Sequence, residues 1–199
     1  MKNIYSITDS IAWSIKALFY KYLRYKGPFK YLIEKENNSL QQLIEHVHDI
    51  DGHILDLGTG TGNVIRSLPY DTRVTGIDIN LHMLKVARSL FHSNFVIANL
   101  LALPVKNESI GFVTLVGILE YIAEPDTLFK ELIRVLKQDS CAIVTYSPDS
   151  TISRLRKLTG NRVIIRNIRE LEFYIEKYGF EIVEAKLLNT QHQLLIKKR

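Results

Sequence analysis

Short apolar runs alternate with amphipathic segments along most of the chain. Such runs lie at 53–58 (HILDLG), 73–78 (RVTGID), 94–99 (NFVIAN), 111–117 (GFVTLVG) and 141–147 (CAIVTYS). Runs of this kind are typical of strands that are buried on both faces. Helical patterns lie between them, notably at 81–91 and 127–137. Strands that alternate with helices predict βαβ units and a mostly parallel sheet.

The C-terminal part of the chain predicts how the sheet closes. An amphipathic helix at 169–179 stops at Gly179, and two strands follow at 180–188 and 191–198, joined through Asn189 and Thr190. These two strands predict an antiparallel hairpin. The expected fold is therefore α/β: a Rossmann-like, doubly wound, seven-stranded sheet, mostly parallel, with an antiparallel closing hairpin.

The first fifty residues have helical patterns only. They predict one helix from about Thr8 to the Gly27-Pro28 break, a short helix at 29–35, and a third at 40–48 capped by Ser39. We expect residues 1–50 to form a helical extension on the substrate side, and residues 51–199 to form the main domain.

Composition narrows the class of protein. With 46% hydrophobic and 24% charged residues, the chain can bury a core and is not a disordered polyelectrolyte. The single cysteine, Cys141, excludes an internal disulfide framework and a cysteine-based zinc cage. No metal site is expected. No signal peptide and no bilayer-spanning stretch are evident at the N-terminus, so a cytoplasmic location is expected.

The most informative segment is ILDLGTGTGN at 54–63, with glycine at positions 58, 60 and 62. Glycine at a strand-to-helix turn lets the backbone approach a ligand where any Cβ would collide. A dinucleotide-binding turn would have its third glycine at Asn63, so this pattern differs from it. Asp56 would repel a pyrophosphate and suits a ligand with a positive charge. For the loop alone, a tight turn without a ligand is the alternative.

A second carboxylate, Asp78, ends the next predicted strand. An acid at this position accepts the two hydroxyls of a ribose in nucleotide-binding folds. For Asp78 alone, an ordinary strand-end residue is an equal alternative. The glycine loop and Asp78 together, in this order, favour a nucleotide-like ligand.

These motifs resemble those of class I S-adenosylmethionine-dependent methyltransferases. ILDLGTGTG and VTGIDINLHMLKVAR match the first two motifs of that family, and the similarity continues to about residue 148, through an LP turn and the LEYI segment. The resemblance implies S-adenosylmethionine as cofactor and S-adenosylhomocysteine as product. The residues that the family would use to bind it are Asp56, Gly58, Thr59, Gly60, Gly62, Asp78, Ile79, Met83, Asn99, Leu100 and Val116.

In that family, the glycine loop wraps the amino-acid end of the cofactor, with Asp56 near its ammonium group. Asp78 would hold the ribose, and Ile79 and Met83 would pack on the adenine. Asn99, with the Leu100 N–H, would bind the adenine edge. The family usually has Asp in place of Asn99, so we expect weaker adenine recognition without the charge.

The sequence specifies the methyl acceptor less well than the cofactor. Methyl transfer from a sulfonium needs a base only when the acceptor must lose a proton, and the weak candidates are Glu120 and Tyr121, after the fourth strand, and His192. A helix-start acid, a half-buried ring and a structural histidine are the favoured alternatives. The aromatic residues of the N-terminal helix are further candidates for the pocket wall, although most are expected only to cover the sheet: Trp13, Phe19, Tyr20, Tyr22 and Tyr25.

Residues 151–169 hold six basic residues and no acidic one. Such a segment favours an anionic substrate, a membrane surface or RNA, and a solvated face is an equal alternative.

The leading hypothesis is a methyltransferase for a small molecule, anionic or aromatic, with the methylated O, N or C atom left open. An RNA methyltransferase and a non-catalytic regulatory subunit are the alternatives. Against RNA, the Gly117–Glu120 segment lacks the Asn/Asp-Pro-Pro-aromatic motif of base-amino methylases.

Overall fold

The computed structural model describes residues 30–47, 50, 52–69, 71–158 and 163–199. Its elements, in chain order, are α2 (Lys30–Glu45), β1 (His53–Leu57), η1 (Val64–Ser67), β2 (Arg73–Asp78), α3 (Leu81–Leu90), β3 (Asn94–Ile97), β4 (Ile110–Leu115), η2 (Leu119–Tyr121), α4 (Asp126–Val135), β5 (Leu136–Tyr146), α5 (Thr151–Leu158), α6 (Ile168–Lys177), β6 (Phe180–Leu187) and β7 (His192–Lys198).

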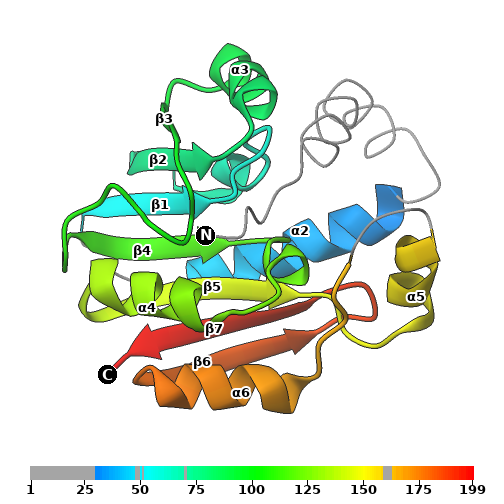
Figure 1. The fold of residues 1–199 in the computed structure, drawn as a ribbon. Helices are drawn as coiled ribbons and strands as arrows, with labels where there is room; N and C mark the ends of the chain where they lie inside the picture. Colours follow the sequence, from blue (N-terminus) through cyan, green and yellow to red (C-terminus); the bar gives the residue numbers. More distant parts are fainter. Residues whose placement is uncertain (1–29, 48–49, 51, 70, 159–162) are drawn as a thin grey trace.

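The strands form one seven-stranded sheet in the order β3-β2-β1-β4-β5-β7-β6 (Figure 1). The pairs from β3 to β5 are parallel, and β7 runs antiparallel to both β5 and β6. The predicted α/β sheet and its closing hairpin are confirmed. The strand order reverses between β1 and β4, and open α/β sheets bind ligands outside the carboxyl ends of the strands at such a point.

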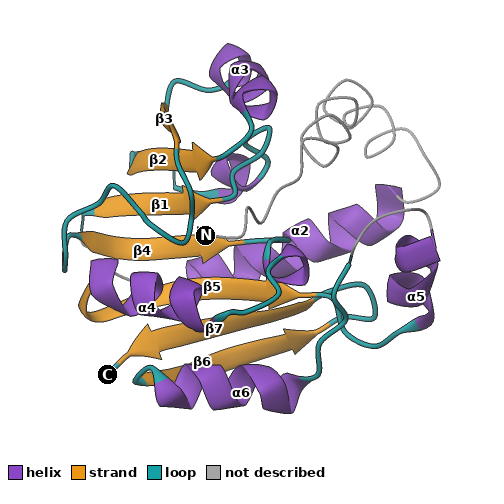
Figure 2. Ribbon diagram, viewed as in Figure 1, coloured by secondary structure: helices purple, strands orange, loops and turns teal. Residues whose placement is uncertain are grey.

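Helices cover both faces of the sheet (Figure 2). On one face, α4 and α6 pack over inward-facing residues such as Leu55 and Val113. On the other face, α2 packs over Ile54 and Phe112, the neighbours of those residues along the strands. This alternation explains why the strands read as continuous apolar runs, since both sides of each strand are buried.

The two short helices expected at 29–35 and 40–48 form one continuous helix, α2. Ser39 lies inside this helix and is only 8% exposed, so it does not begin a new one. No glycine or proline interrupts 30–45, and Leu40, Leu43 and Ile44 bury one face against the sheet. This packing overrides the local preference of serine for a cap. Residues 1–29, with the predicted first helix and its aromatic residues, lie outside the described part.

The helix expected directly after the glycine loop is the short 3₁₀ helix η1 rather than an α-helix. Pro69 follows it closely and restricts Leu68 to the extended conformation that the structure shows (ψ 150°). Two other helix ends are well defined, and the predicted stop at Gly179 is one of them. The Asn80 side chain caps α3 by accepting from His82 N and Met83 N, and Gly179 ends α6 with φ +76°.

Candidate functional site

The glycine loop begins where β1 ends, at the carboxyl edge of the sheet. The N–H groups of Gly58 and Thr59 both donate to the Ile77 carbonyl oxygen of β2, at 2.7 and 3.0 Å. The Gly62 N–H donates to the Thr59 carbonyl at 2.8 Å and closes the turn. The loop is therefore held against the end of β2, where Asp78 lies.

The three glycines of this loop have positive φ but different surroundings. A Cβ on Gly58 would lie 2.1 Å from Ile118 Cδ1, and a Cβ on Gly62 would lie 2.7 Å from the Phe91 ring. A Cβ on Gly60 would meet nothing closer than 3.9 Å. Gly58 and Gly62 are thus required by packing within the protein, whereas Gly60 faces open space.

Asp78 joins the glycine loop to the start of α3. Its Oδ2 accepts from Gly60 N at 2.9 Å and its Oδ1 accepts from Asn80 N at 2.8 Å. Burial raises the pKa of this carboxyl group, and the backbone hydrogen bonds oppose that shift. Ile79 N–H is a third backbone donor to this group, and because a carboxylate has about four acceptor sites, acceptor capacity remains for a hydroxyl group.

Asp56 lies beneath the loop and is only 1% exposed. Its two oxygens accept from the hydroxyls of Thr59 (2.6 Å) and Thr114 (2.7 Å). Burial raises its pKa to about 6, although both hydroxyl bonds lower it. This geometry places Thr59 between Asp56 and the loop surface, so an effect of Asp56 on a ligand would pass through the loop.

The residues expected around an adenine lie on three neighbouring segments. Ile79 follows Asp78 and is 45% exposed, which is high for a large apolar residue at a sheet edge, whereas Met83 is buried in α3. Asn99 is exposed after β3, and its Oδ1 accepts from Leu101 N at 3.0 Å. Leu100 is half-buried against the main core.

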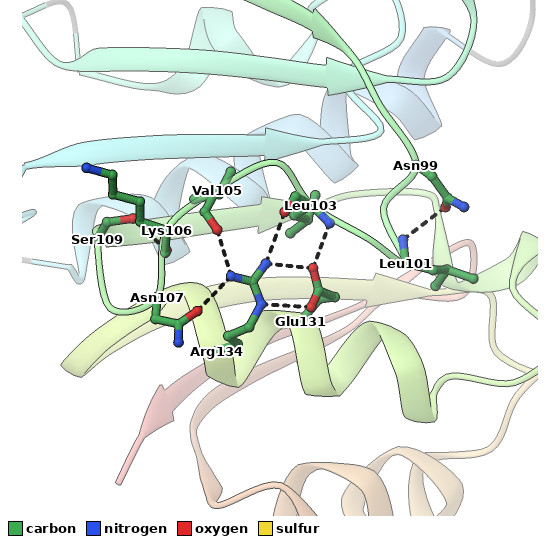
Figure 3. A network of polar contacts seen from close by, with 9 residues as sticks. All are labelled: Asn99, Leu101, Leu103, Val105, Lys106, Asn107, Ser109, Glu131 and Arg134. Atoms are coloured by element: carbon green, nitrogen blue, oxygen red, sulfur yellow. Dashed lines mark hydrogen bonds and ion pairs between the residues drawn. The ribbon is translucent and has the colours of Figure 1, made fainter.

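The loop after β3 is held by an ion pair on α4 (Figure 3). The Arg134 guanidinium donates to the carbonyls of Val105 and Leu103 and to both oxygens of Glu131. Glu131 Oε2 in turn accepts from Leu103 N at 2.6 Å. Sequence analysis missed this pair, because an Arg three residues after a Glu on a helix also fits an ordinary surface ion pair.

The chain after β4 forms the other wall of this edge. Val116 is half-buried, and Gly117 follows it with φ +70° and donates its N–H to Thr145 Oγ1 at 2.8 Å. The 3₁₀ helix η2 then carries both candidate bases. Glu120 lies in the first turn of η2 and is only 1% exposed, and Tyr121 is half-buried.

Arg166 corrects the interpretation of the basic segment. It is 3% exposed, and its guanidinium donates to the carbonyls of Leu119, Ile122 and Ala123 and to Glu170. Arg154 is exposed but pairs with Asp149 at 2.8 Å. At least these two of the six basic residues are therefore paired with other groups of the protein.

His192 lies at the start of β7, opposite Tyr146 at the end of β5. The Tyr146 hydroxyl and His192 Nδ1 are 2.7 Å apart, and the rings meet edge to face. The sequence favoured a structural role for this histidine, and the structure shows its ring hydrogen-bonded to Tyr146. Among the described residues, no group of three or more His, Cys, Asp or Glu side chains could hold a metal ion.

Residues 55–144 match a family model described as a methyltransferase domain. This range contains the glycine loop, Asp78, Asn99 and η2. Residues 55–144 therefore form a methyltransferase domain.

Known proteins similar to this methyltransferase differ in their assigned roles. An uncharacterized protein of Methanocaldococcus jannaschii is 29% identical over 80% of this chain and 71% of its own length. A Haloferax volcanii protein in complex with the Trm112 methyltransferase activator shares the fold, with a TM-score of 0.75, 16% identity, and coverage of 93% and 96% of the two chains. Magnesium protoporphyrin IX methyltransferase from Synechocystis, with bound S-adenosylhomocysteine, has a TM-score of 0.69, 18% identity, and coverage of 83% of each chain.

Proposed function

We propose that this methyltransferase transfers the methyl group of S-adenosylmethionine to a small-molecule acceptor at the carboxyl edge of β4 and β5. The observation that carries the choice of acceptor is the burial of Arg166. Arg166, near the C-terminal end of the basic segment, is thereby used to hold the turn after β4 and is not exposed to a nucleic acid, which favours a small-molecule acceptor. The Synechocystis neighbour, a magnesium protoporphyrin IX methyltransferase, is an example of this class of acceptor.

The residues at the glycine loop fit the cofactor. Gly60 faces open space that a Cβ would enter, and Asp78 beside it offers carboxylate lone pairs for the ribose hydroxyls. Exposed Ile79 offers an apolar surface for the adenine, with Met83 beneath it in α3 and Asn99 and Leu100 at the adenine edge. Gly58, Thr59, Gly62 and Val116 complete the set. When bound, S-adenosylmethionine supplies an electrophilic methyl group on a sulfonium.

The protein's own contribution is positioning. Arg166 holds the carbonyls on both sides of η2, and Ile164 N donates to the Glu120 carbonyl at 2.8 Å. The turn that carries Glu120 and Tyr121 is therefore fixed. Holding an acceptor in line and excluding water can supply much of the rate enhancement without a dedicated base.

An RNA acceptor is less well supported than a small molecule. RNA binding relies on several unpaired basic residues and on aromatic side chains that stack on bases. Of the six basic residues at 151–169, Arg166 is buried and Arg154 is paired. Of the described helices, none has both the length and the apolarity needed to cross a bilayer.

Binding of S-adenosylhomocysteine to the full chain, measured by calorimetry, tests the cofactor site. We expect Asp78→Ala to weaken binding by about 1–3 kcal/mol, which is the cost of losing hydrogen bonds to a charged group. The exposed Asp71, changed to Asn, is the matched control and should bind as the wild type does. Unchanged affinity in a folded Asp78→Ala variant would refute the ribose role.

Transfer of labelled methyl groups from S-adenosylmethionine into cell extract then tests the acceptor class. We expect label in the small-molecule fraction. Label confined to RNA would favour the RNA alternative. Cofactor binding with no transfer by the isolated chain, and transfer only with a co-purifying protein, would favour a subunit that needs an activator, as in the Haloferax complex.

A further inference from the structure

A second concave site lies along the same sheet edge, beside β5 and β7. It is a cavity of about 270 Å³ lined by 148–150 after β5, 166–168 before α6, Asn189 of the β6–β7 turn, and His192. All of these residues belong to the described part of the chain. The cofactor assignment uses none of them.

The Tyr146–His192 contact determines which ring nitrogen of His192 carries the hydrogen. Tyr146 is fully buried, and burial raises the pKa of its phenol, so the hydroxyl keeps its hydrogen. Its hydrogen-bond partner is His192 Nδ1, so the hydroxyl must donate there, because a buried donor without an acceptor is costly. Burial also lowers the pKa of His192, which keeps the ring neutral at pH 7. The ring hydrogen therefore sits on Nε2, which is left as a donor at the cavity.

Arg166 supplies a second donor to the cavity. A guanidinium has five N–H groups. The Leu119, Ile122 and Ala123 carbonyls and Glu170 account for four of them, and the fifth, on Nη1, has no acceptor among the described residues. Because Arg166 is 3% exposed and lines the cavity, this N–H belongs to a rigid, buried side chain.

The surroundings of the cavity favour an anion. The described side chains of residues 148–170 include three basic residues (Arg154, Arg166 and Arg169) and two acidic ones, and both acids, Asp149 and Glu170, are already paired with arginines. The Asn167 side-chain oxygen is also used, since it accepts from Glu170 N at 2.8 Å and caps α6. Its amide group is left as a donor, so the site offers mainly N–H groups.

We propose that this cavity binds a carboxylate group of the methyl acceptor, held by His192 Nε2–H and Arg166. The assignment rests on the proposed function and gives its substrate class: a small molecule with a carboxylate at a distance from the methylated atom. The proposed carboxylate site lies at β7 and the proposed cofactor site at β1, three strands apart in the sheet, which is about 14 Å at the usual strand spacing. An acceptor bound at both places must therefore extend along the carboxyl edge of the sheet.

Benzoate and its neutral analogue benzamide are suitable probes, read by ¹H–¹⁵N spectra of the histidine side chains in the full chain. We expect the free protein to show His192 as the Nε2–H tautomer. Benzoate should shift the His192 signals saturably, with a Kd of about 1–10 mM, and benzamide should bind about tenfold more weakly, since charge-assisted hydrogen bonds are stronger.

His53 is the internal control. It is also half-buried, with its Nε2 2.8 Å from Thr75 Oγ1, but it lies at the opposite, amino-terminal edge of the sheet. Its signals should not move. His192→Ala should weaken benzoate binding about tenfold, followed on the backbone N–H of Asn189, and His192→Gln, which keeps an N–H donor, should restore part of it.

Three results would overturn the proposal: no saturable shift of His192, equal binding of benzamide, or displacement of benzoate by saturating S-adenosylhomocysteine. The last would show that the two ligands share one site. Failure of the proposed function is seen separately, as a lack of S-adenosylhomocysteine binding by calorimetry in the same samples.

Discussion

Asp56 shows at the scale of one residue how a buried acid shapes the cofactor side of the sheet. The apolar strand around it makes ionisation costly, and the hydroxyls of Thr59 and Thr114 recover part of that cost. The hydrogen bonds also fix the direction of Thr59, the second residue of the glycine loop. Asp56 thus acts as a positioning residue for the loop above it.

The titration of Asp56 predicts a pH-dependent stability. The folded protein keeps the proton to a pKa of about 6, whereas the unfolded chain releases it near 3.8, so the free energy of unfolding falls as pH rises between these values. A shift of about two pKa units corresponds to about 3 kcal/mol. Asp56→Asn removes this loss, so its stability relative to the wild type should be about 2 kcal/mol higher at pH 8 than at pH 4.5, because about a third of the loss has already occurred by pH 4.5.

Urea unfolding of both proteins at the two pH values measures this difference. The exposed Asp71→Asn variant controls for a general loss of one negative charge. An Asp56→Asn effect of equal size at both pH values would contradict a raised pKa.

Gly58 gives a second prediction at this scale. Gly58→Ala combines a positive φ with a Cβ placed 2.1 Å from Ile118, whereas Gly179→Ala has a similar φ and open space around it. We expect Gly179→Ala to cost about 1 kcal/mol, the strain of a left-handed alanine, and Gly58→Ala to cost about 1–3 kcal/mol more through overpacking. The Gly58→Ala/Ile118→Ala double variant should recover much of that extra loss. Chemical denaturation measures all three, and equal costs for the two glycines would exclude the Ile118 contact.

At the scale of elements, α4 determines the path of the loop after β3. One ion pair, Arg134 with Glu131, bonds to the backbone of Leu103 and Val105 (Figure 3). Because this loop continues from Asn99, the helix on one face of the sheet also positions the proposed adenine edge.

Arg134→Met should therefore destabilise the protein by about 1–3 kcal/mol, because it leaves a partly buried carboxylate and two carbonyls without their donor. It should also weaken S-adenosylhomocysteine binding, although Arg134 does not belong to the proposed cofactor site. Lys130→Met, on an exposed position of the same helix, is the control. Unfolding and calorimetry on the same samples test both effects, and a loss of stability without any change in affinity would separate the loop from the cofactor site.

The sequence predicted the strands, α3, α4 and α6 because each has its own periodicity and its own start or stop residue. It failed where packing between distant segments decides the outcome. Ser39 was predicted to cap a helix, but Leu40 and Leu43 pack against the sheet, and this packing keeps Ser39 inside α2. Arg166 resembled a surface charge because nothing local shows that its partners lie more than forty residues earlier.

At the scale of the whole molecule, Lys198 joins the closing hairpin to the rest of the fold. Residue Lys198 is only 7% exposed, and its Nζ donates to the carbonyls of Ile133 (3.0 Å) and Leu136 (2.8 Å), where α4 passes into β5. It also reaches Glu108, at 3.2 Å. A single ammonium group therefore bonds to three separate segments.

Lys198→Met should lower the free energy of unfolding by about 1–3 kcal/mol, because two buried carbonyls lose a charged donor. Its neighbour Lys197 forms a surface ion pair with Asp139, and Lys197→Met should cost clearly less, because exposed ion pairs contribute little to stability. Thermal melts of both variants measure the contrast, and similar losses would show that the carbonyls find other donors.

The position of β7 between β5 and β6 has a consequence for the order in which a nascent chain folds. β6 is synthesised before β7, yet within the sheet it pairs with β7 alone. Until residues 192–198 leave the ribosome, the outer side of β5 is an unpaired edge and β6 has no neighbour to join. Unpaired edges are the surfaces at which chains associate wrongly. Slow translation through this region would therefore prolong a state that depends on chaperones.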